Sequence, residues 1–107
     1  MTTPTLFSPT DMAHWPVSAS GLSRVALSNG DIEVRHYVPK DHDPQRPHDR
    51  DELYFVIAGH GLFERNGVTP AVKAGDALFA AAGDEHRFAQ FSDDFATWVL
   101  FYGATKA

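Results

Sequence analysis

Two histidines and one glutamate carry the clearest chemistry in this sequence, because the chain has six histidines and no cysteine. His48 and Glu52 are four residues apart, so on a regular β-strand both side chains point to the same face. His86 opens a later segment, just after a glycine turn at Gly83. If that segment lies opposite the first, two imidazoles and one carboxylate meet. Such a set binds a divalent metal ion and leaves coordination positions open.

The composition excludes several other kinds of protein. A chain of 107 residues has room for one domain, and 43% hydrophobic residues are enough for a core. Without cysteine there is no disulfide framework, thiolate zinc site or thiol nucleophile. A net charge of −5 has the wrong sign for nucleic-acid binding. We also expect no membrane segment, and with no signal peptide in residues 1–10 we expect a cytoplasmic protein.

The elements that must position these residues are short β-strands. Residues 1–21 contain three prolines and no period-two pattern, so they are predicted to form an N-terminal arm with one helical turn near Asp11, anchored by Trp15. Residues 22–107 alternate apolar runs with turn residues and are predicted to form one all-β domain, a sandwich or a small barrel. The Asn-Gly pairs at 29–30 and 66–67 favour tight hairpins. The predicted strands are 24–28, 32–38, 53–58, 62–65, 68–72, 77–80, 86–91 and 95–102.

The spacing of these residues also resembles the two motifs of the cupin superfamily. The segment from His48 through Glu52 to Gly59 is similar to the second half of the first motif, and residues 75–90, with His86, are similar to the second. The resemblance covers about residues 22 to 102. It implies a double-stranded β-helix, which is a jelly-roll barrel that often dimerises, and it implies that His48, Glu52 and His86 are metal ligands.

The first motif departs from the family pattern at one ligand position. Arg46 stands where a first histidine is usual, and Lys40 stands at the usual glycine. The amide oxygen of Gln45 is a candidate to fill the missing position, since cupins that resemble phosphomannose isomerase use a glutamine ligand; otherwise water fills it. Arg46 is a candidate for binding an anionic substrate, because a guanidinium offers a bidentate fork, although a surface ion pair is the plainer interpretation.

Strand alternation predicts which residues line the cavity and which need covering. Residues that share the parity of the ligands should face inward: Tyr54, Val56, Phe88 and Gln90. Residues of opposite parity should face outward: Leu53, Phe55 and Ile57. Because a row of large apolar groups needs covering, either the arm with Trp15 or a second subunit packs there, and we predict a homodimer.

The leading hypothesis is a metal-binding cupin that acts on a small polar or anionic molecule. One divalent ion (Fe, Zn, Mn or Ni) would be held by His48, Glu52 and His86, with an Fe(II)-dependent dioxygenase, an isomerase or a lyase as candidate activities. The alternative is a non-catalytic cupin that binds a small ligand or serves as an accessory protein. In the plainest interpretation, His48 and Glu52 form only an ion pair at the barrel mouth. A vestigial site is disfavoured, because a buried unpaired carboxylate is costly.

Overall fold

The computed structural model describes residues 4–14 and 23–103, and this part of the chain is all-β apart from one 3-10 turn, Asp11–His14 (η1). The strands that follow are β1 (Ser23–Asn29), β2 (Ile32–Tyr37), β3 (Asp51–Ala58), β4 (His60–Arg65), β5 (Ala71–Lys73), β6 (Ala77–Ala80), β7 (His86–Ala89) and β8 (Ala96–Tyr102). All the pairings between these strands are antiparallel. No helix in the described residues is long and apolar enough to span a membrane.

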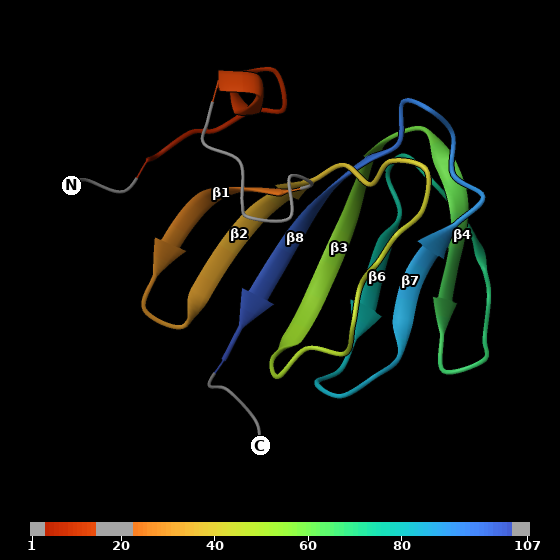
Figure 1. Ribbon diagram of the computed structural model, residues 1–107. Coiled ribbons are helices and arrows are strands. Elements are labelled where there is room, and N and C mark those ends of the chain that lie inside the picture. The colour runs from red at the N-terminus through yellow and green to blue at the C-terminus, as the bar shows by residue number, and fades with distance from the viewer. Residues whose placement is uncertain (1–3, 15–22, 104–107) are drawn as a thin grey trace.

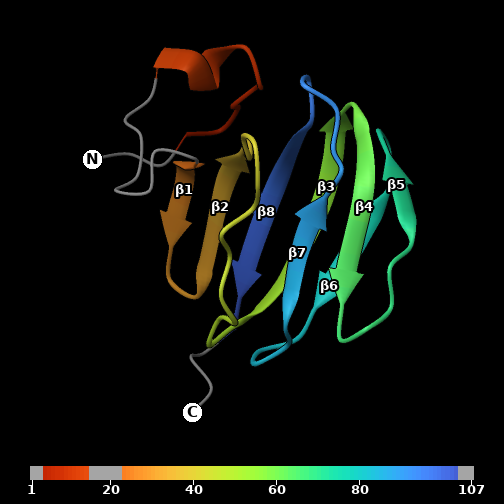
Figure 2. The ribbon, with the colours of Figure 1, turned by 45° about the vertical axis from the view of Figure 1, so that its right-hand side comes forward.

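Two antiparallel sheets face each other across the core. One sheet has the order β1-β2-β8-β3-β6, and the other has the order β5-β4-β7. Figure 1 shows the five-stranded sheet running across the molecule, and Figure 2 shows β4, β5 and β7 lying over β3 and β6. The loop before β3 reaches the loop before β7, where the Gly83 amide donates a hydrogen bond to the His48 carbonyl at 2.8 Å. The topology therefore brings the two predicted motifs together.

The two Asn-Gly pairs both form hairpin turns, but of different kinds. Asn66 and Gly67 both have positive φ angles, 47° and 87°, as a type I′ turn requires. At the first hairpin, Asn29 still belongs to β1 and the loop is Gly30-Asp31, with a positive φ at Gly30 alone. A glycine at the first loop position is typical of a type II′ turn. The hairpin prediction is confirmed at both sites, and only the register of the first differs.

Two strands, β5 and β7, are two residues shorter than predicted, each for a local reason. β5 begins at Ala71 rather than at residue 68, because Pro70 has no amide hydrogen for the ladder. Val68 forms only an isolated bridge to Arg65. β7 ends at Ala89, and Gln90 follows with a φ of 48°, a left-handed conformation that interrupts the alternation of side chains.

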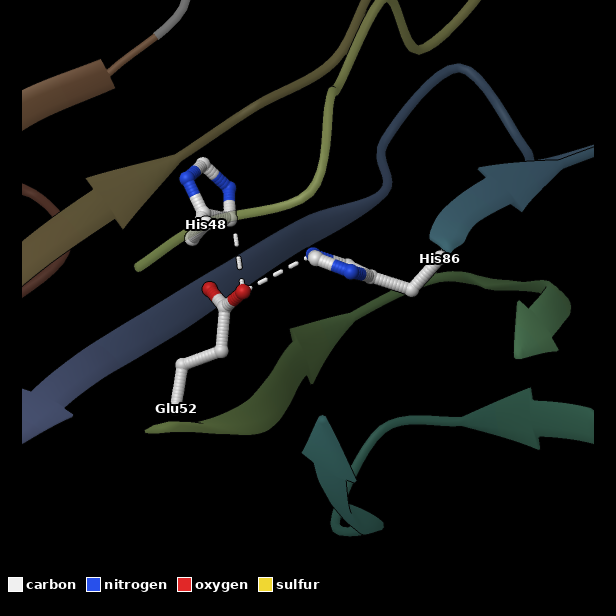
Figure 3. Close-up of side chains that lie close together, drawn as sticks. All are labelled: His48, Glu52 and His86. Atoms are coloured by element: carbon white, nitrogen blue, oxygen red, sulfur yellow. Dashed lines mark ion pairs between the residues drawn. The ribbon is translucent and has the colours of Figure 1, made fainter. Parts of the chain in front are cut away.

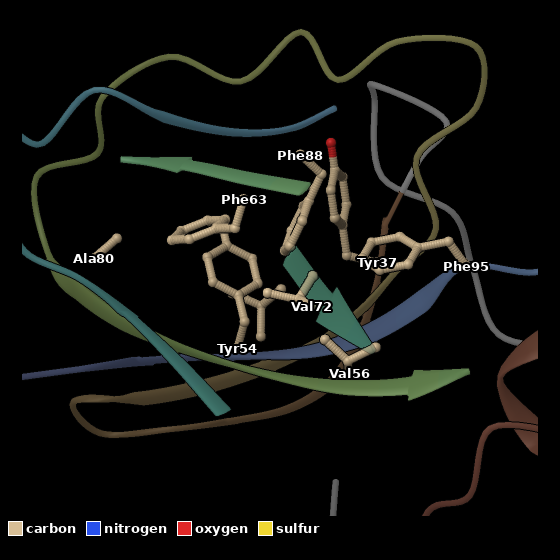
Figure 4. Close-up of a cluster of buried hydrophobic side chains, with 9 residues drawn as sticks. Tyr37, Tyr54, Val56, Phe63, Val72, Ala80, Phe88 and Phe95 are labelled. Carbon is tan, nitrogen blue, oxygen red and sulfur yellow. The ribbon is translucent and has the colours of Figure 1, made fainter. Parts of the chain in front are cut away.

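The core lies between the sheets and is rich in aromatic rings (Figure 4). Its buried members are Tyr37, Tyr54, Val56, Phe63, Val72, Ala80, Phe88, Phe95 and Val99. Alternation along β3 is clear, since Tyr54 is fully buried and Phe55 is 42% exposed. This pattern confirms the period-two prediction for that strand.

The N-terminal segment covers part of the outer face of the large sheet. The Asp11 amide donates to the Ser8 carbonyl at 3.0 Å, which starts the 3-10 turn predicted near this residue. Met12 is fully buried, and the Phe7 ring packs edge-on against Trp98 of β8 with centroids 5.5 Å apart. Trp15, the predicted anchor, lies outside the described residues. Among those described, Phe7 and Met12 supply the arm's apolar contacts.

Replacing Gly59 by alanine should destabilise the fold strongly. Gly59 joins β3 to β4 with a φ of 77°, and an added Cβ would meet Ser92 Oγ, Asp94 Oδ1 at 2.8 Å and Phe95 Cα at 2.9 Å. The strained backbone and the overlap together should cost about 3 kcal/mol. The matched control is Gly75→Ala, where φ is 96° but no heavy atom lies within 4 Å of the new Cβ, so about 1 kcal/mol is expected. Equal shifts of the two variants in thermal unfolding would contradict this assignment.

Candidate metal centre

Three side chains from separate parts of the chain meet between the sheets (Figure 3). His48 lies in the loop before β3, Glu52 is on β3, and His86 is the first residue of β7. Glu52 Oε1 lies 2.8 Å from His86 Nε2 and 3.6 Å from His48 Nε2. One candidate ligand atom from each residue lies within 4.8 Å of the others. The geometry thus brings together the three residues singled out by their spacing.

The route by which His48 reaches this point differs from the prediction. β3 begins at Asp51, so His48 is not on the same regular strand as Glu52. The preceding loop contains Pro44 and Pro47, which cannot donate ladder hydrogen bonds. His48 is instead placed by the contact of its carbonyl with Gly83. The side chains of His48 and Glu52 do meet as predicted. However, the loop before β3, and not the alternation of side chains along one strand, brings His48 to this point.

The orientation of the His86 ring is set by a backbone carbonyl. His86 Nδ1 lies 3.0 Å from the carbonyl oxygen of Asp84, and since that oxygen can only accept, Nδ1 must carry the hydrogen. In the neutral ring Nε2 then presents its lone pair to Glu52 Oε1 at 2.8 Å. Two electron-rich atoms at this distance repel each other unless a proton or a metal ion lies between them. This contact therefore requires either a protonated His86 or a cation bound by both atoms.

Glu52 has the features of a ligand rather than of a surface carboxylate. It is 1% exposed, and neither carboxylate oxygen has a hydrogen bond of good geometry; the same holds for His86 Nε2. Burial lowers the pKa of His86, but the adjacent Glu52 and the Asp84 carbonyl outweigh it, so the net pKa is raised. A proton on Nε2 therefore stabilises this cluster, and a metal ion at the same nitrogen would have to displace it.

His48 forms the more open side of the cluster. Its side chain is 34% exposed and packs edge-on against Phe101, with centroids 5.3 Å apart. Burial lowers the pKa of His48, and nearby His86 adds to this effect, while Glu52 opposes it. The ring is therefore biased toward the neutral form that a metal ion requires. Its Nε2 also lies 3.2 Å from Gln45 Oε1.

A cavity of about 270 Å³ opens beside His48 and Glu52. Two arginines, two tyrosines and apolar groups contribute to its wall: Ser23, Arg35, Tyr37, Pro44, Gln45, Arg46, His48, Glu52, Tyr54, Val99 and Phe101. Arg35 and Arg50 both form an ion pair with Glu33: Arg35 Nε lies 2.7 Å and the nearer Arg50 nitrogen 3.8 Å from Glu33 Oε2. Among the described residues, no carboxylate lies within ion-pair distance of Arg46. Arg46 therefore adds a positive charge to a cavity wall that also contains the Glu52 carboxylate.

The remaining predicted site residues fall into three groups. Tyr54, Gln45 and Arg46 line the cavity. Val56 and Phe88 point inward but belong to the packed core. Gln90 was predicted to face inward from the alternation of side chains along its strand. Because β7 ends at Ala89 and Gln90 has a left-handed φ, that alternation does not extend to Gln90.

Sequence reasoning missed Asp43, Arg35 and Phe101. Asp43 is 5% exposed, although it stands within the densely charged segment 40–52, where its neighbours Asp41 and His42 are exposed. No local signal separates it from those neighbours. Arg35 and Phe101 share the inward parity of β2 and β8, and this parity could have identified them once the two strands were known to pair.

The loop that carries His86 is fixed by Asp84. One carboxylate oxygen accepts from Arg65 Nε at 2.7 Å and from the Ala81 amide at 2.8 Å, and the other accepts from Asn66 Nδ2 at 3.0 Å. The Asp84 carbonyl accepts from the His86 ring. These bonds tie the loop to the β4–β5 turn and so position the imidazole.

Asp84→Asn should lower stability at neutral pH but not in acid. Hydrogen bonds from Asn66 and Arg65 lower the pKa of Asp84 to about 2. A depressed pKa means that the carboxylate stabilises the fold above its unfolded value of about 3.9 and loses that contribution as the pH falls through about 2. Because the carboxylate is close to solvent, we expect Asp84→Asn to lower the free energy of unfolding by about 1 kcal/mol at pH 7. Urea unfolding at pH 7 and near pH 2 measures this, and a difference that persists undiminished in acid would argue against it.

Comparison with known sequences identifies the family. The family model described as "Cupin domain" matches residues 33–102. An uncharacterized protein of Streptomyces coelicolor is 36% identical over 59 residues, which are 55% of this chain and 56% of that protein. An oxalate-binding protein of Thermotoga maritima is 25% identical over 89 residues, covering 65% of this chain and 74% of that protein. The match to the Streptomyces protein thus spans little more than half of its length.

Comparison with solved structures supports the same assignment. A cupin 2 conserved barrel domain protein from Salinispora arenicola superposes with a TM-score of 0.72 over 94% of this chain and 91% of that chain, at 17% identity. At this identity the likeness concerns the fold alone. Together with the family match over most of the chain, it confirms the predicted double-stranded β-helix. The chain belongs to the cupin family.

Proposed function

We propose that this cupin binds one divalent metal ion through His48, Glu52 and His86. The observation that carries the proposal is the contact of Glu52 Oε1 with His86 Nε2 at 2.8 Å, where both atoms are buried and lack a hydrogen bond of good geometry. Ligands about 2.1 Å from one ion lie about 3.0 to 3.4 Å apart. The separations of 2.8 and 3.6 Å around Glu52 Oε1 bracket that range.

The donor set limits the metal and leaves room for further ligands. Two imidazoles and one carboxylate suit Fe, Zn, Mn or Ni, and three protein ligands leave coordination positions open. Gln45 is the candidate for a fourth protein ligand, because its Oε1 lies 3.2 Å from His48 Nε2. When bound, the ion would supply Lewis acidity, and iron would also suit oxygen chemistry of the dioxygenase type. Isomerase and lyase activities are compatible with the same ligands.

The cavity suits a small polar or anionic molecule. Arg46 and Arg35 contribute positive charge to its wall, while Val99 and Phe101 give it an apolar side. The curated name of the Thermotoga relative, an oxalate-binding protein, supports a small carboxylate. It also favours the second candidate function, a non-catalytic cupin that binds a small ligand or serves as an accessory protein. Turnover of a small carboxylate by the metal-loaded protein separates an enzyme from a binder.

Metal analysis tests the central proposal. Protein purified without a chelator or a metal-binding tag should contain, or regain on reconstitution, one ion per chain by elemental analysis. His86→Ala should remove that ion, because the variant loses an imidazole ligand. Sub-stoichiometric metal that does not recover, or full occupancy in His86→Ala, would overturn the proposal.

We also propose that the chain forms a homodimer through the outer face of the large sheet. Phe55 and Phe79 remain 42% and 39% exposed there, and Leu53, Ile57 and Leu100 are only partly buried. The described part of the arm contacts Trp98, and Phe55 and Phe79 remain exposed beside it, although the Arg65 guanidinium lies over the Phe79 ring. Sedimentation at micromolar concentration should give the mass of a dimer, and a monomer would refute this assignment.

Three further assignments complete the proposal. Residues 1–21 form an arm on a single barrel domain that comprises residues 22–107. The net charge of −5 argues against nucleic-acid partners, and we expect no membrane partner. We place the protein in the cytoplasm, and fractionation of cells that produce it tests this location.

A further inference from the structure

A buried carboxylate beside the cluster binds three hydrogen-bond donors. Asp43 is 5% exposed and lies in the loop between β2 and β3. It accepts from the Tyr37 hydroxyl on one oxygen, and from the Phe88 amide at 2.8 Å and Gln45 Nε2 at 2.6 Å on the other. Tyr37 and Phe88 belong to different sheets. Asp43 is thus anchored to both sheets and holds the side chain of Gln45.

These contacts decide which way the Gln45 amide faces. A carboxylate can only accept, so the nitrogen of the amide must point to Asp43 and the oxygen must point away from it. That oxygen accepts from the Tyr54 hydroxyl at 2.6 Å and lies 3.2 Å from His48 Nε2. An amide oxygen can only accept, so the phenol hydrogen of Tyr54 lies in this contact.

The amide oxygen is thereby presented to the cluster with its second lone pair toward His48. A carbonyl oxygen has two lone pairs, and the Tyr54 hydroxyl occupies one of them. The other faces His48 Nε2 at hydrogen-bond distance, so in the metal-free protein it accepts from an Nε2–H, and a metal ion would take the place of that hydrogen. The separation of 3.2 Å from His48 Nε2 lies within the range of about 3.0 to 3.4 Å expected for neighbouring ligands of one ion.

We propose that Asp43 is a positioning residue that holds Gln45 as the fourth protein ligand of the metal centre. Gln45 supplies the ligand that is missing from the first cupin motif, because Arg46 stands where that motif has a histidine. This inference rests on the proposed metal function. Asp43 does not bind the ion; it fixes the amide through Nε2, as outer hydrogen bonds orient the ligands of other metal sites.

Cobalt(II) is a suitable probe, because its absorption bands respond to the number of ligands. Metal-free wild-type protein and the variants Gln45→Ala, Asp43→Ala and Asp43→Ala/Gln45→Ala are titrated with cobalt. We expect each single variant to bind about 10-fold more weakly than wild type, with the same altered spectrum. The double variant should bind no more weakly than Gln45→Ala, because Asp43 acts only through Gln45. Additive losses would overturn the proposal.

Conservative variants separate positioning from general damage to the fold. Asp43→Asn should keep the wild-type affinity and spectrum, because its amide oxygen can still accept from Gln45 and Phe88 while its NH₂ group faces the Tyr37 oxygen. If Asp43→Ala does not fold, Asp43→Ser replaces it, since its hydroxyl is too short to reach Gln45. Asp76→Ala is the matched control: this carboxylate also accepts a backbone amide, from Lys73 at 2.8 Å, but in the turn before β6, and cobalt affinity should not change.

The outcomes distinguish this inference from the proposed function. Wild-type protein that binds one cobalt ion, together with an unchanged Gln45→Ala variant, overturns the fourth-ligand assignment and leaves the metal function standing. Loss of cobalt affinity in Asp43→Asn equal to that in Asp43→Ala overturns the positioning role. Wild-type protein that binds no cobalt overturns both proposals.

Discussion

Glu52→Gln should weaken metal binding by more than about 100-fold, since it removes the only negative charge among the three proposed ligands His48, Glu52 and His86. The substitution preserves the shape of a side chain that is 1% exposed, so repacking should be small. In the metal-free protein the glutamine amide can donate to His86 Nε2, which lacks a hydrogen bond of good geometry in the wild type. We therefore expect the metal-free variant to be folded and no less stable than metal-free wild type at neutral pH.

Calorimetric titration with zinc and thermal unfolding with and without zinc measure this effect. An ion at 100 times its dissociation constant stabilises a folded protein by about 2.7 kcal/mol, and the variant should lose this stabilisation. The matched control is Glu64→Gln, whose carboxylate forms an exposed ion pair with Arg87 at 2.8 Å. Wild-type zinc affinity in Glu52→Gln would exclude Glu52 as a ligand.

Phe88→Ala should have the largest effect on stability, a loss of about 3 to 5 kcal/mol. Phe88 is 1% exposed, and its ring centroid lies 5.1 Å from those of Tyr54 and Phe63 and 4.9 Å from that of Phe95 (Figure 4). Truncation leaves a cavity among rings held by both sheets, which cannot close around it. The loss is a large share of the 5 to 15 kcal/mol typical of a whole domain.

Urea unfolding at one fixed protein concentration measures this loss, since the proposed homodimer would make stability depend on concentration. Phe88→Leu should cost only about 1 kcal/mol, because it retains most of the buried volume. Ile32→Ala is the surface control, as Ile32 is 45% exposed at the start of β2, and its change should stay within about 0.5 kcal/mol. A loss in Phe88→Ala as small as that of the control would mean that the core is not packed around this ring.

Much of the fold could be predicted because the signals are local. Alternation of apolar residues marked β3, and Asn66-Gly67 marked a hairpin that the φ angles confirm. These patterns depend only on neighbouring residues and on the two-residue repeat of a strand. They can therefore be recognised in the sequence without knowledge of any tertiary contact. The strand predictions were wrong where the backbone departs from the two-residue repeat. Gln90 has a left-handed φ and lies beyond the end of β7, and Pro70 precedes β5, which begins only at Ala71.

The candidate site likewise contains residues that the sequence identified and residues that only the tertiary structure revealed. Residue type and motif spacing alone pointed to His48, Glu52 and His86, because only nitrogen and oxygen donors were available to hold a metal ion. The sequence could not show that His48 is placed by a loop, nor that Asp43, one charged residue among many, is buried. Asp43 meets the Phe88 amide across 45 positions of the chain. Such a contact depends on how the two sheets pack, so only the tertiary structure decides it.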